Sequence, residues 1–411
     1  MGRDFNTIRN GPRPIDIDIL LYDHVEYSDE ALTIPHIAMQ EREFVLRPLC
    51  EYVPSAFCFW LYIASFWSLF VNRPLLALLP NHSIAKDVEH PKLYRHISQL
   101  LSQLLLKQEE QPSDSQIHKS VPLRGQIWHW DAKTYIMGIL NTTPDSFSDG
   151  GNYSTTESAV LRAQQLVDDG ADIIDIGGMS TRPNSEEISE EEEIRRVVPV
   201  IQLLRARGFE HPISVDTFRA SVADAAVEAG ADLINDVSAG RRDPAMYAVM
   251  AKWNVPVCLM HMRGDSKTMM ALTDYGEKND VIAEIAKDLN KSVQRAIAAG
   301  VHRWNIIVDP GVGFAKDGEQ SLQVLRRLPD LIQESPSSKS PLAGYPCLVG
   351  PSRKAFIGKL IQQQDALKRT WGTAAACTAS VAGGAGIVRV HDVKEIRDVV
   401  KVSDAIWRVK A

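Results

Sequence analysis

Polar and charged side chains end many of the short apolar runs in this sequence. Asp309 would accept paired hydrogen bonds from an amino group and an adjacent ring N–H of a flat heterocycle. Arg182, Arg389 and His391 suit an anion with several oxygens, such as pyrophosphate, and Asn141 would offer Mg²⁺ a neutral oxygen ligand. The positions at these run ends are Asn141, 177–182, Asp216, 235–236, His261, Asp309, 352–354 and 389–391.

A second pair of carboxylates lies near the start of the sequence. Asp16 and Asp18 are two residues apart in the run GPRPIDIDILLY, which begins at residue 11, so on a strand both would point to one face. With Arg13 close by, this spacing would hold Mg²⁺ on a nucleotide phosphate. Such a site also needs walls, and residues 1–10 are all that precede the run.

Other chemistries have little support in the residue pattern. The sequence has no histidine pair at i and i+4, no serine elbow and no cysteine–histidine pair, which disfavours zinc hydrolysis and covalent catalysis. The net charge of −7 argues against a nucleic-acid partner. The five cysteines lie apart, which predicts buried thiols in a reducing intracellular compartment. We see neither a signal peptide nor a transit segment at the N-terminus.

Several polar residues are interpreted as structural. A lone aspartate at a strand end more often caps the next helix than binds a substrate, so Asp236 and Asp392 are assigned cap or structural roles. His211 and His302 precede strand-like runs and are interpreted as surface histidines.

The elements that must position the polar residues alternate along residues 126–411. Apolar strand-like runs occupy 134–140, 172–178, 213–217, 233–237, 255–261, 305–310, 346–350 and 386–391. Helix-period segments occupy 156–169, 190–207, 219–229, 243–252, 279–300, 319–328 and 371–384, with a last helix after Asp392. Eight such units predict an α/β fold of the (β/α)₈ TIM-barrel type. A doubly wound open sheet is the alternative, but it would spread the strand ends along a line, whereas a barrel gathers them at one mouth.

The preceding residues divide into two zones. Residues 1–54 are predicted to form one strand, loops and a closing segment, and residues 55–125 an apolar insert and linker. The run AFCFWLYIASFWSLFV is short for a membrane span. It could be a membrane-interacting segment, a buried helix or sequence foreign to the fold, such as a translated intron. We favour the last of these three interpretations. The polar stretch 107–120 is predicted to be a flexible linker.

The motifs of residues 126–411 closely resemble those of dihydropteroate synthase. They are, in order, MGILNTTPDSFSDGG (137–151), DIGGMSTRP (175–183), SVDT (214–217), INDVS (234–238), MHMRG (260–264), DPGVGFAK (309–316), GPSRKAFIG (350–358) and RVHDV (389–393). This resemblance implies a folate-pathway transferase. It would condense dihydropterin-6-ylmethyl diphosphate with p-aminobenzoate to give dihydropteroate and diphosphate, with Mg²⁺ assisting loss of diphosphate.

The resemblance also implies roles for individual residues. Asp216, Asn235, Asp309 and Lys354 match the family's pterin pocket, while Asn141, Arg389 and His391 match its diphosphate and magnesium site. Residues 142–151 and 180–184 match two mobile loops that bring Thr181 and Arg182 to the substrates. Phe147, Pro183 and Phe314 would line the p-aminobenzoate site, with Ser352 beside it. Three positions depart from the usual family text, namely Met179, Asn184 and Ala355, and Ala355 puts p-aminobenzoate affinity in doubt.

Residues 1–54 resemble the C-terminal part of hydroxymethyl-dihydropterin pyrophosphokinase. This likeness implies an incomplete α+β, ferredoxin-like fragment in which Asp16 and Asp18 would bind magnesium and Arg13, His36 and Arg42 would contact the phosphates of ATP. The family's first half is not in these residues, and an edge strand without its sheet is not stable alone, so we expect no kinase activity. The order of the two regions suggests a fused folate protein of fungal or plant type.

The remaining expectations follow from the resemblance. Small-molecule substrates, a homodimer, no nucleic acid and no membrane partner are expected. An intracellular, cytoplasmic location is the default and a mitochondrial one the alternative. The competing functions are a bifunctional protein whose kinase half is completed by another chain, and a pterin-binding barrel without catalysis.

Overall fold

The computed structural model describes residues 120–408, except for 131, 144–154, 180–184, 277–279 and 334–339, together with six short strands nearer the N-terminus. The chain divides into two compact units, Met1–Ile117 and His118–Ala411. Each unit is described below by itself.

The described residues of the first unit form three antiparallel strand pairs. They are β1 (Ile17–Ile19) with β4 (Tyr62–Ala64), β2 (Tyr27–Ser28) with β3 (Thr33–Ile34), and β5 (Glu89–His90) with β6 (Arg95–His96). Asp18 pairs with Ile63 in the first of these ladders. The other predicted kinase residues, Arg13, Asp16, His36 and Arg42, lie outside the described residues. Among the described residues, no helix is long and apolar enough to cross a membrane.

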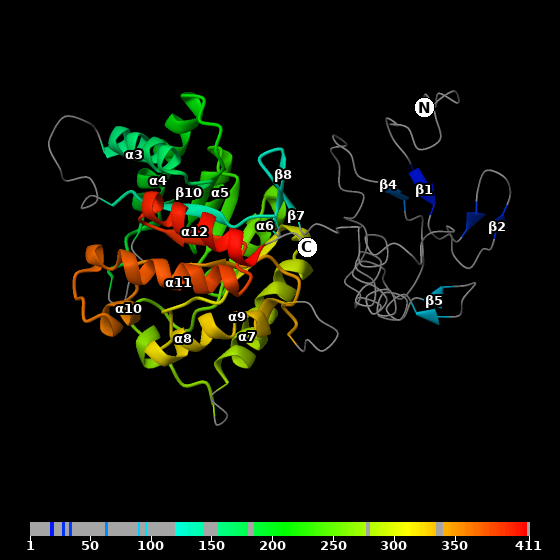
Figure 1. Cartoon of the computed structure of the whole chain (residues 1–411). Helices are drawn as coiled ribbons and strands as arrows, with labels where there is room; N and C mark the ends of the chain where they lie inside the picture. Colours follow the sequence, from blue (N-terminus) through cyan, green and yellow to red (C-terminus); the bar gives the residue numbers. More distant parts are fainter. Residues whose placement is uncertain are drawn as a thin grey trace. The chain divides into compact units, whose positions relative to one another are not determined.

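The second unit is a parallel barrel, as the sequence predicts (Figure 1). Its strands pair in the order β14, β13, β12, β11, β10, β9, β16, β15, and a parallel bridge between Val308 and Cys347 joins the two end strands. The strands are β9 (Tyr135–Asn141), β10 (Ile173–Gly177), β11 (Ile213–Asp216), β12 (Leu233–Asp236), β13 (Val257–Met260), β14 (Ile306–Asp309), β15 (Leu348–Val349) and β16 (Ile387–Val390).

Helices cover the outside of this barrel (Figure 1). Those that were predicted are α3 (Thr155–Asp169), α4 (Glu190–Ala206), α5 (Ala220–Glu228), α6 (Met246–Trp253), α7 (Val281–Ala298), α8 (Gly318–Arg326), α11 (Thr370–Ala382) and α12 (Val393–Trp407). Two short helices, α9 (Leu328–Ile332) and α10 (Ala355–Leu360), were not. The predicted helix 319–328 is divided between α8 and α9, because Pro329 near the start of α9 begins a new helix more readily than it continues an old one.

A β-hairpin closes the barrel at the N-terminal ends of its strands. β7 (Ser120–Leu123) and β8 (Gln126–His129) pair around Arg124 and Gly125, both at positive φ, as two-residue hairpin turns require. The hairpin and the residue after it bury Val121, Leu123, Trp128 and Trp130 against the lowest inward side chains of the strands, which are Tyr135, Met137, Ile173, Leu233, Cys258, Ile307, Leu348 and Ile387. The predicted barrel boundary at residue 126 falls inside this hairpin, and the second compact unit begins at His118.

Candidate active site

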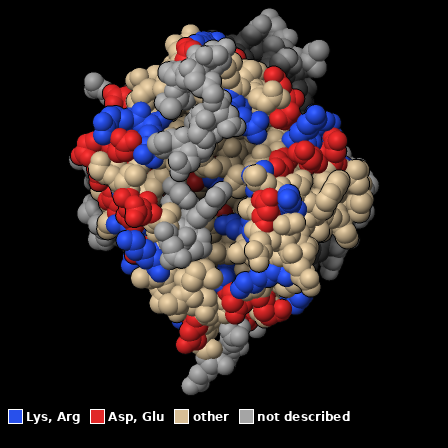
Figure 2. Space-filling view, turned by 90° about the vertical axis from the view of Figure 1, so that its left-hand side faces the viewer, with Lys and Arg blue, Asp and Glu red and all other residues tan. Residues whose placement is uncertain are grey.

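The candidate site lies inside the barrel, one layer of inward side chains above the apolar residues that pack on the β7–β8 hairpin. Successive side chains on a strand alternate between two faces, so the positions two residues beyond Ile173, Leu233, Ile307 and Ile387 also point inward. Those positions are Asp175, Asn235, Asp309 and Arg389, and Asp216 occupies the equivalent place at the end of β11. The polar layer therefore follows from the strand period. Figure 2 shows a hollow on this side of the molecule with acidic and basic side chains inside it.

Arg389 connects the carboxylates of this layer. Its Nε donates to Asp175 Oδ2 and its Nη2 donates to Asp216 Oδ2, each at 2.6 Å. The amide nitrogen of Asn235 donates to the same Asp175 oxygen at 3.1 Å. These hydrogen bonds connect β10, β11, β12 and β16. Asp216, Asn235 and Arg389 were predicted site residues, whereas Asp175 was not.

The carboxylates at this layer are perturbed by burial. Desolvation, together with the nearby Asp175, raises the pKa of Asp216 to about 7 despite the opposing effect of Arg389. Burial lowers the pKa of Arg389, but the two carboxylates outweigh it and raise that pKa above its ordinary value. Within the described part of the chain, Asp175 Oδ1 and Asp216 Oδ1 are buried oxygens with no hydrogen-bond partner. An unpaired buried acceptor is costly, so Asp216 Oδ1 is suited to an N–H donor of a ligand.

Asp309 and Phe314 lie on the turn that follows β14. Asp309 Oδ1 accepts from the backbone N–H of Gly311 at 2.7 Å. Burial raises the pKa of Asp309 to about 6, while the Gly311 N–H and the Lys354 ammonium oppose this rise. Lys354 Nζ lies 3.7 Å from the centre of the Phe314 ring, so these two predicted residues meet across different loops.

The predicted Ser352 and His391 also meet. Ser352 Oγ lies 3.0 Å from His391 Nδ1 and accepts from the His391 backbone N–H at 3.2 Å. Between Ser352 and Lys354 the chain passes through Arg353 at a φ of 58°, and the Arg353 guanidinium is held by Asp392, with Nε donating to Oδ2 at 3.1 Å. Asp392, the residue before α12, therefore holds the turn formed by Ser352, Arg353 and Lys354. Asp392 is structural through this ion pair; its side chain does not cap α12.

Asn141 is placed at the mouth, and the two predicted loops are only partly described. Asn141 ends β9, half-buried, in register with Gly177 of β10. Thr142 follows and donates through Oγ1 to the Gly177 carbonyl at 3.1 Å. Phe147, Thr181, Arg182, Pro183 and Asn184 lie outside the described residues.

Apolar residues form a wall beside the polar layer. Met179, Phe218, Val237, Met260, Met262, Met269 and Ala315 pack together, with Ile188 and Phe314 against them. Met179, where the resemblance leads one to expect a polar residue, is buried at 8% exposure in this cluster. Its thioether side chain therefore extends an apolar surface.

Asp236, His211 and His302, which were interpreted as structural, make no side-chain hydrogen bond to the candidate ligand-binding groups in the described structure. The Asp236 carboxylate accepts from the Ser238 backbone N–H at 2.8 Å and from the Gly240 N–H at 2.5 Å, which fixes the turn after β12. His211 is exposed and His302 is partly exposed and stacked on Trp304. His261, unlike these two histidines, is buried at 1% exposure. This predicted strand-end residue therefore lies in the interior.

Family comparisons agree with this geometry. Residues 137–391 match the model of the pterin binding enzyme family, and residues 1–54 match that of 7,8-dihydro-6-hydroxymethylpterin-pyrophosphokinase. The folic acid synthesis protein fol1 of Schizosaccharomyces pombe is 43% identical over 99% of this chain and 48% of its own length. The chain thus spans about half the length of that relative. The dihydropteroate synthase of a Synechocystis strain is 48% identical over 70% of this chain and 95% of its own length.

Solved structures share the barrel. A Xanthomonas albilineans dihydropteroate synthase with 4-aminobenzoic acid is 40% identical, with a TM-score of 0.63, and the match covers 71% of this chain and 100% of that one. The same enzyme in complex with 7,8-dihydropteroate is 38% identical with a TM-score of 0.61 over the same shares.

Fold and site together define a (β/α)₈-barrel enzyme of the pterin-binding class. Within that class the chain belongs to the dihydropteroate synthase family of folate biosynthesis, and its residues 1–54 are similar to the pyrophosphokinase family.

Proposed function

We propose that the barrel condenses 7,8-dihydropterin-6-ylmethyl diphosphate with p-aminobenzoate to form 7,8-dihydropteroate and diphosphate. In this reaction the bond from the methylene carbon to the diphosphate oxygen breaks, a bond from that carbon to the amine nitrogen forms, and the amine gives up one proton. An aromatic amine is neutral at pH 7, so the proposal needs no strong general base. The solved relative with 7,8-dihydropteroate supports the choice of product.

The observation that carries the proposal is the polar layer inside the barrel. Asp216, Asn235 and Asp309 surround a place where a flat ring with several N–H groups would satisfy buried acceptors, above all Asp216 Oδ1. We assign these three residues and Lys354 to the pterin. Asp175 holds Arg389 and Asn235 in place from behind.

The charge that leaves with diphosphate requires stabilisation by cations. We assign Arg389 and His391, with Arg182 from the second loop, to this end of the substrate. Asn141 would hold Mg²⁺ through its amide oxygen, because magnesium is usually bound by few protein oxygens plus substrate phosphates and water. When bound, the ion would supply charge neutralisation for the leaving group.

The second substrate would bind nearer to the mouth. Phe314, with Phe147 and Pro183 from the two loops, is proposed to line the p-aminobenzoate site, and Ser352 and Thr181 to lie beside it. Closure of the loops 142–151 and 180–184 over the reactants would exclude water, which would otherwise capture the electron-deficient methylene carbon.

The test is an assay of the full chain with synthetic pterin diphosphate, p-aminobenzoate and Mg²⁺, with dihydropteroate detected by mass spectrometry. Lys354→Ala is expected to abolish product formation, while Lys359→Ala, at an exposed lysine of α10, the helix that follows Lys354, should leave it unchanged. Near-normal turnover in Lys354→Ala would refute the assignment of the pterin pocket, and no product from the unaltered chain would refute the reaction.

For the N-terminal region we propose descent from the pyrophosphokinase, on the strength of the match over residues 1–54. Asp16 and Asp18 would be its magnesium ligands and Arg13, His36 and Arg42 its ATP phosphate contacts. The expected absence of kinase activity stays a prediction, as do the homodimer and the intracellular location.

A further inference from the structure

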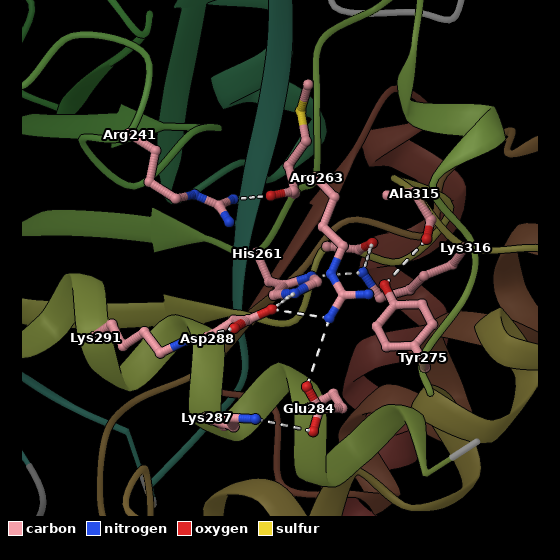
Figure 3. Close-up of polar contacts among 12 residues, drawn as sticks. Arg241, His261, Arg263, Tyr275, Glu284, Lys287, Asp288, Lys291, Ala315 and Lys316 are labelled. Atoms are coloured by element: carbon pink, nitrogen blue, oxygen red, sulfur yellow. Dashed lines mark hydrogen bonds and ion pairs between the residues drawn. The ribbon is translucent and has the colours of Figure 1, made fainter. Parts of the chain in front are cut away.

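Lys316 is a buried cation to which the proposed reaction gives no role. It is 2% exposed and lies just beyond the turn that carries Asp309 and Phe314. Its ammonium Nζ lies 3.0 Å from each of three acceptors, namely His261 Nδ1, the Gly311 carbonyl and the Phe314 carbonyl. Figure 3 shows Lys316 beside His261. Burial lowers the pKa of Lys316 well below its usual range. The three acceptors match the three donors of an ammonium group and therefore favour its protonated form.

The 309–316 loop is wound around this ammonium. Gly311, Gly313 and Ala315 have φ values of 66°, 77° and 49°, a coil that turns two carbonyls toward the same point. Gly311 is held from both ends: its N–H donates to Asp309 Oδ1 at 2.7 Å, and its carbonyl accepts from Lys316 and from the Phe314 N–H. A side chain at Gly311 would place its Cβ 2.0 Å from the His261 carbonyl, so the loop sits directly on the end of β13.

His261 fixes the ammonium from the neighbouring strand. Its backbone N–H donates to the Asp309 carbonyl at 2.8 Å, and its ring accepts from Lys316 through Nδ1. Burial, and then the Lys316 charge, lower the pKa of His261 to about 3, so the ring is neutral and its proton is on Nε2. That nitrogen faces Asp288 Oδ2 of α7 at 3.8 Å, and Arg263 and Lys291 hold the Asp288 carboxylate (Figure 3).

We infer that Lys316 is a positioning residue for the pterin pocket, which holds the loop in the shape that presents Asp309 and Phe314 to the barrel mouth. Neutral His261 is the acceptor that fixes the Lys316 Nζ, and its backbone N–H ties His261 to Asp309. The inference rests on the proposed function, because its consequence is measured as pterin affinity. Lys316 itself lies behind the loop and touches no substrate in this arrangement.

Lys316 also adds positive charge behind Asp309. The groups that act on this carboxyl are the Gly311 N–H, Lys354, Lys316 and Arg389, and the buried thiols Cys258 and Cys347 lie close to it. All three cations lower the pKa of Asp309. Loss of the Lys316 charge should therefore raise that pKa, so that pterin binding declines at a higher pH than in the unaltered protein.

The experiment is a titration of the full chain with 6-hydroxymethylpterin, followed by ligand fluorescence between pH 5 and pH 8, for Lys316→Met and for Lys291→Met. Lys316→Met should raise the Kd at pH 7 by about tenfold, the loss expected from one charge-assisted hydrogen bond. It should also move the pH midpoint of binding upward. Lys291 contributes a cation to the exposed edge of the same cluster, and its replacement should leave Kd and midpoint unchanged.

A merely structural lysine would lower the melting temperature without moving the pH midpoint, and that result would overturn the inference, as would a Kd equal to that of the unaltered chain. If Lys316→Met fails to fold, His261→Phe, which removes the acceptor and keeps a ring, decides the same question by the same two readouts. If the unaltered chain does not bind the pterin, the proposed function fails instead.

Discussion

The Asp175 carboxylate lies behind the candidate pterin site and contacts two of its residues. One oxygen accepts from both Arg389 and Asn235, and the side chain is fully buried. Removing one partner from a buried ion pair leaves the other charge uncompensated, which typically costs about 3–5 kcal/mol. Asp175 therefore sets the orientation of groups that would meet the substrate, although it need not meet the substrate itself.

We predict that Asp175→Asn lowers kcat/KM for the condensation by at least about tenfold, because the guanidinium of Arg389 loses one of its two ionic partners. Steady-state kinetics with pterin diphosphate as the varied substrate measure this. Asp168→Asn, an exposed aspartate on α3, is the matched control and should behave as the unaltered protein. Equal kcat/KM in both variants would contradict the role given to Asp175.

The pKa of Asp309 predicts how pH acts on binding. Folding raises this pKa to about 6, above the ordinary carboxyl value, so the stabilising effect on the fold is complete at low pH and is lost as pH rises through about 6. Pterin binding should respond in the opposite direction, since it needs the ionised carboxylate. We predict that pterin affinity falls as pH drops below about 7, where Asp216 and then Asp309 become protonated, and that Asp309→Asn binds weakly and loses the lower of the two steps. A titration of Kd against pH tests both statements.

At this scale the sequence predicts residues at strand ends better than residues within strands. Asp216, Asn235, Asp309 and Arg389 end apolar runs, and the structure brings them together. Asp175 was missed because it lies inside the run DIIDIGG, whose other residues are those of a buried core strand. A charged residue within such a run was the available signal, since a buried carboxylate requires a partner. Lys316 was missed because its partners come from loop carbonyls, which the sequence does not place.

Among the elements, the β7–β8 hairpin makes the clearest contribution to stability. Trp130 is 4% exposed and packs against Tyr135 and Gly386, where a Cβ on the glycine would lie 2.9 Å from the indole. We predict that Trp130→Ala destabilises the barrel by about 3–5 kcal/mol, the usual cost of truncating a large buried aromatic residue. Denaturant unfolding measures the change. Ile127→Ala, at a hairpin residue that is 50% exposed, should change the free energy of unfolding little. Equal losses in the two variants would contradict the stabilising role given to the buried Trp130.

The eight strand–helix repeats could be predicted because each has a buried strand followed by an amphipathic helix of sufficient length. The hairpin, α9 and α10 could not, because they are short. β7 and β8 have four residues each and α9 has five, too few for a periodic pattern to stand out from a loop. The hairpin also depends on a partner distant in sequence, since its apolar face is buried only once the barrel has formed.

For the whole second unit, the distribution of exposed apolar residues bears on assembly. Val402, Ile406 and Trp407 of α12 are 61%, 57% and 58% exposed, and Trp371 of α11 is 81% exposed. We predict that α12 contributes to a homodimer interface, in which a second copy would cover these side chains. Ile406→Glu combined with Val402→Glu should shift the protein to monomer in light-scattering measurements. Met270→Glu, at an exposed apolar residue on another element, should not, and an unaltered chain that is monomeric would refute the prediction.

The aromatic plug at the base of the barrel has a consequence for the order of events. Trp128, Trp130 and the residues packed on them fill the N-terminal end of the described barrel, so we expect substrates to enter at the opposite end. Asp216, Asn235 and Asp309 lie at the inner end of the passage from that entrance, and Phe314 lies on a loop nearer the outside. For the proposed reaction, an aromatic amine that arrived first would obstruct the path of the pterin. For the proposed reaction we therefore expect an order of binding, in which pterin diphosphate enters before the amine and the product leaves before the next turnover starts.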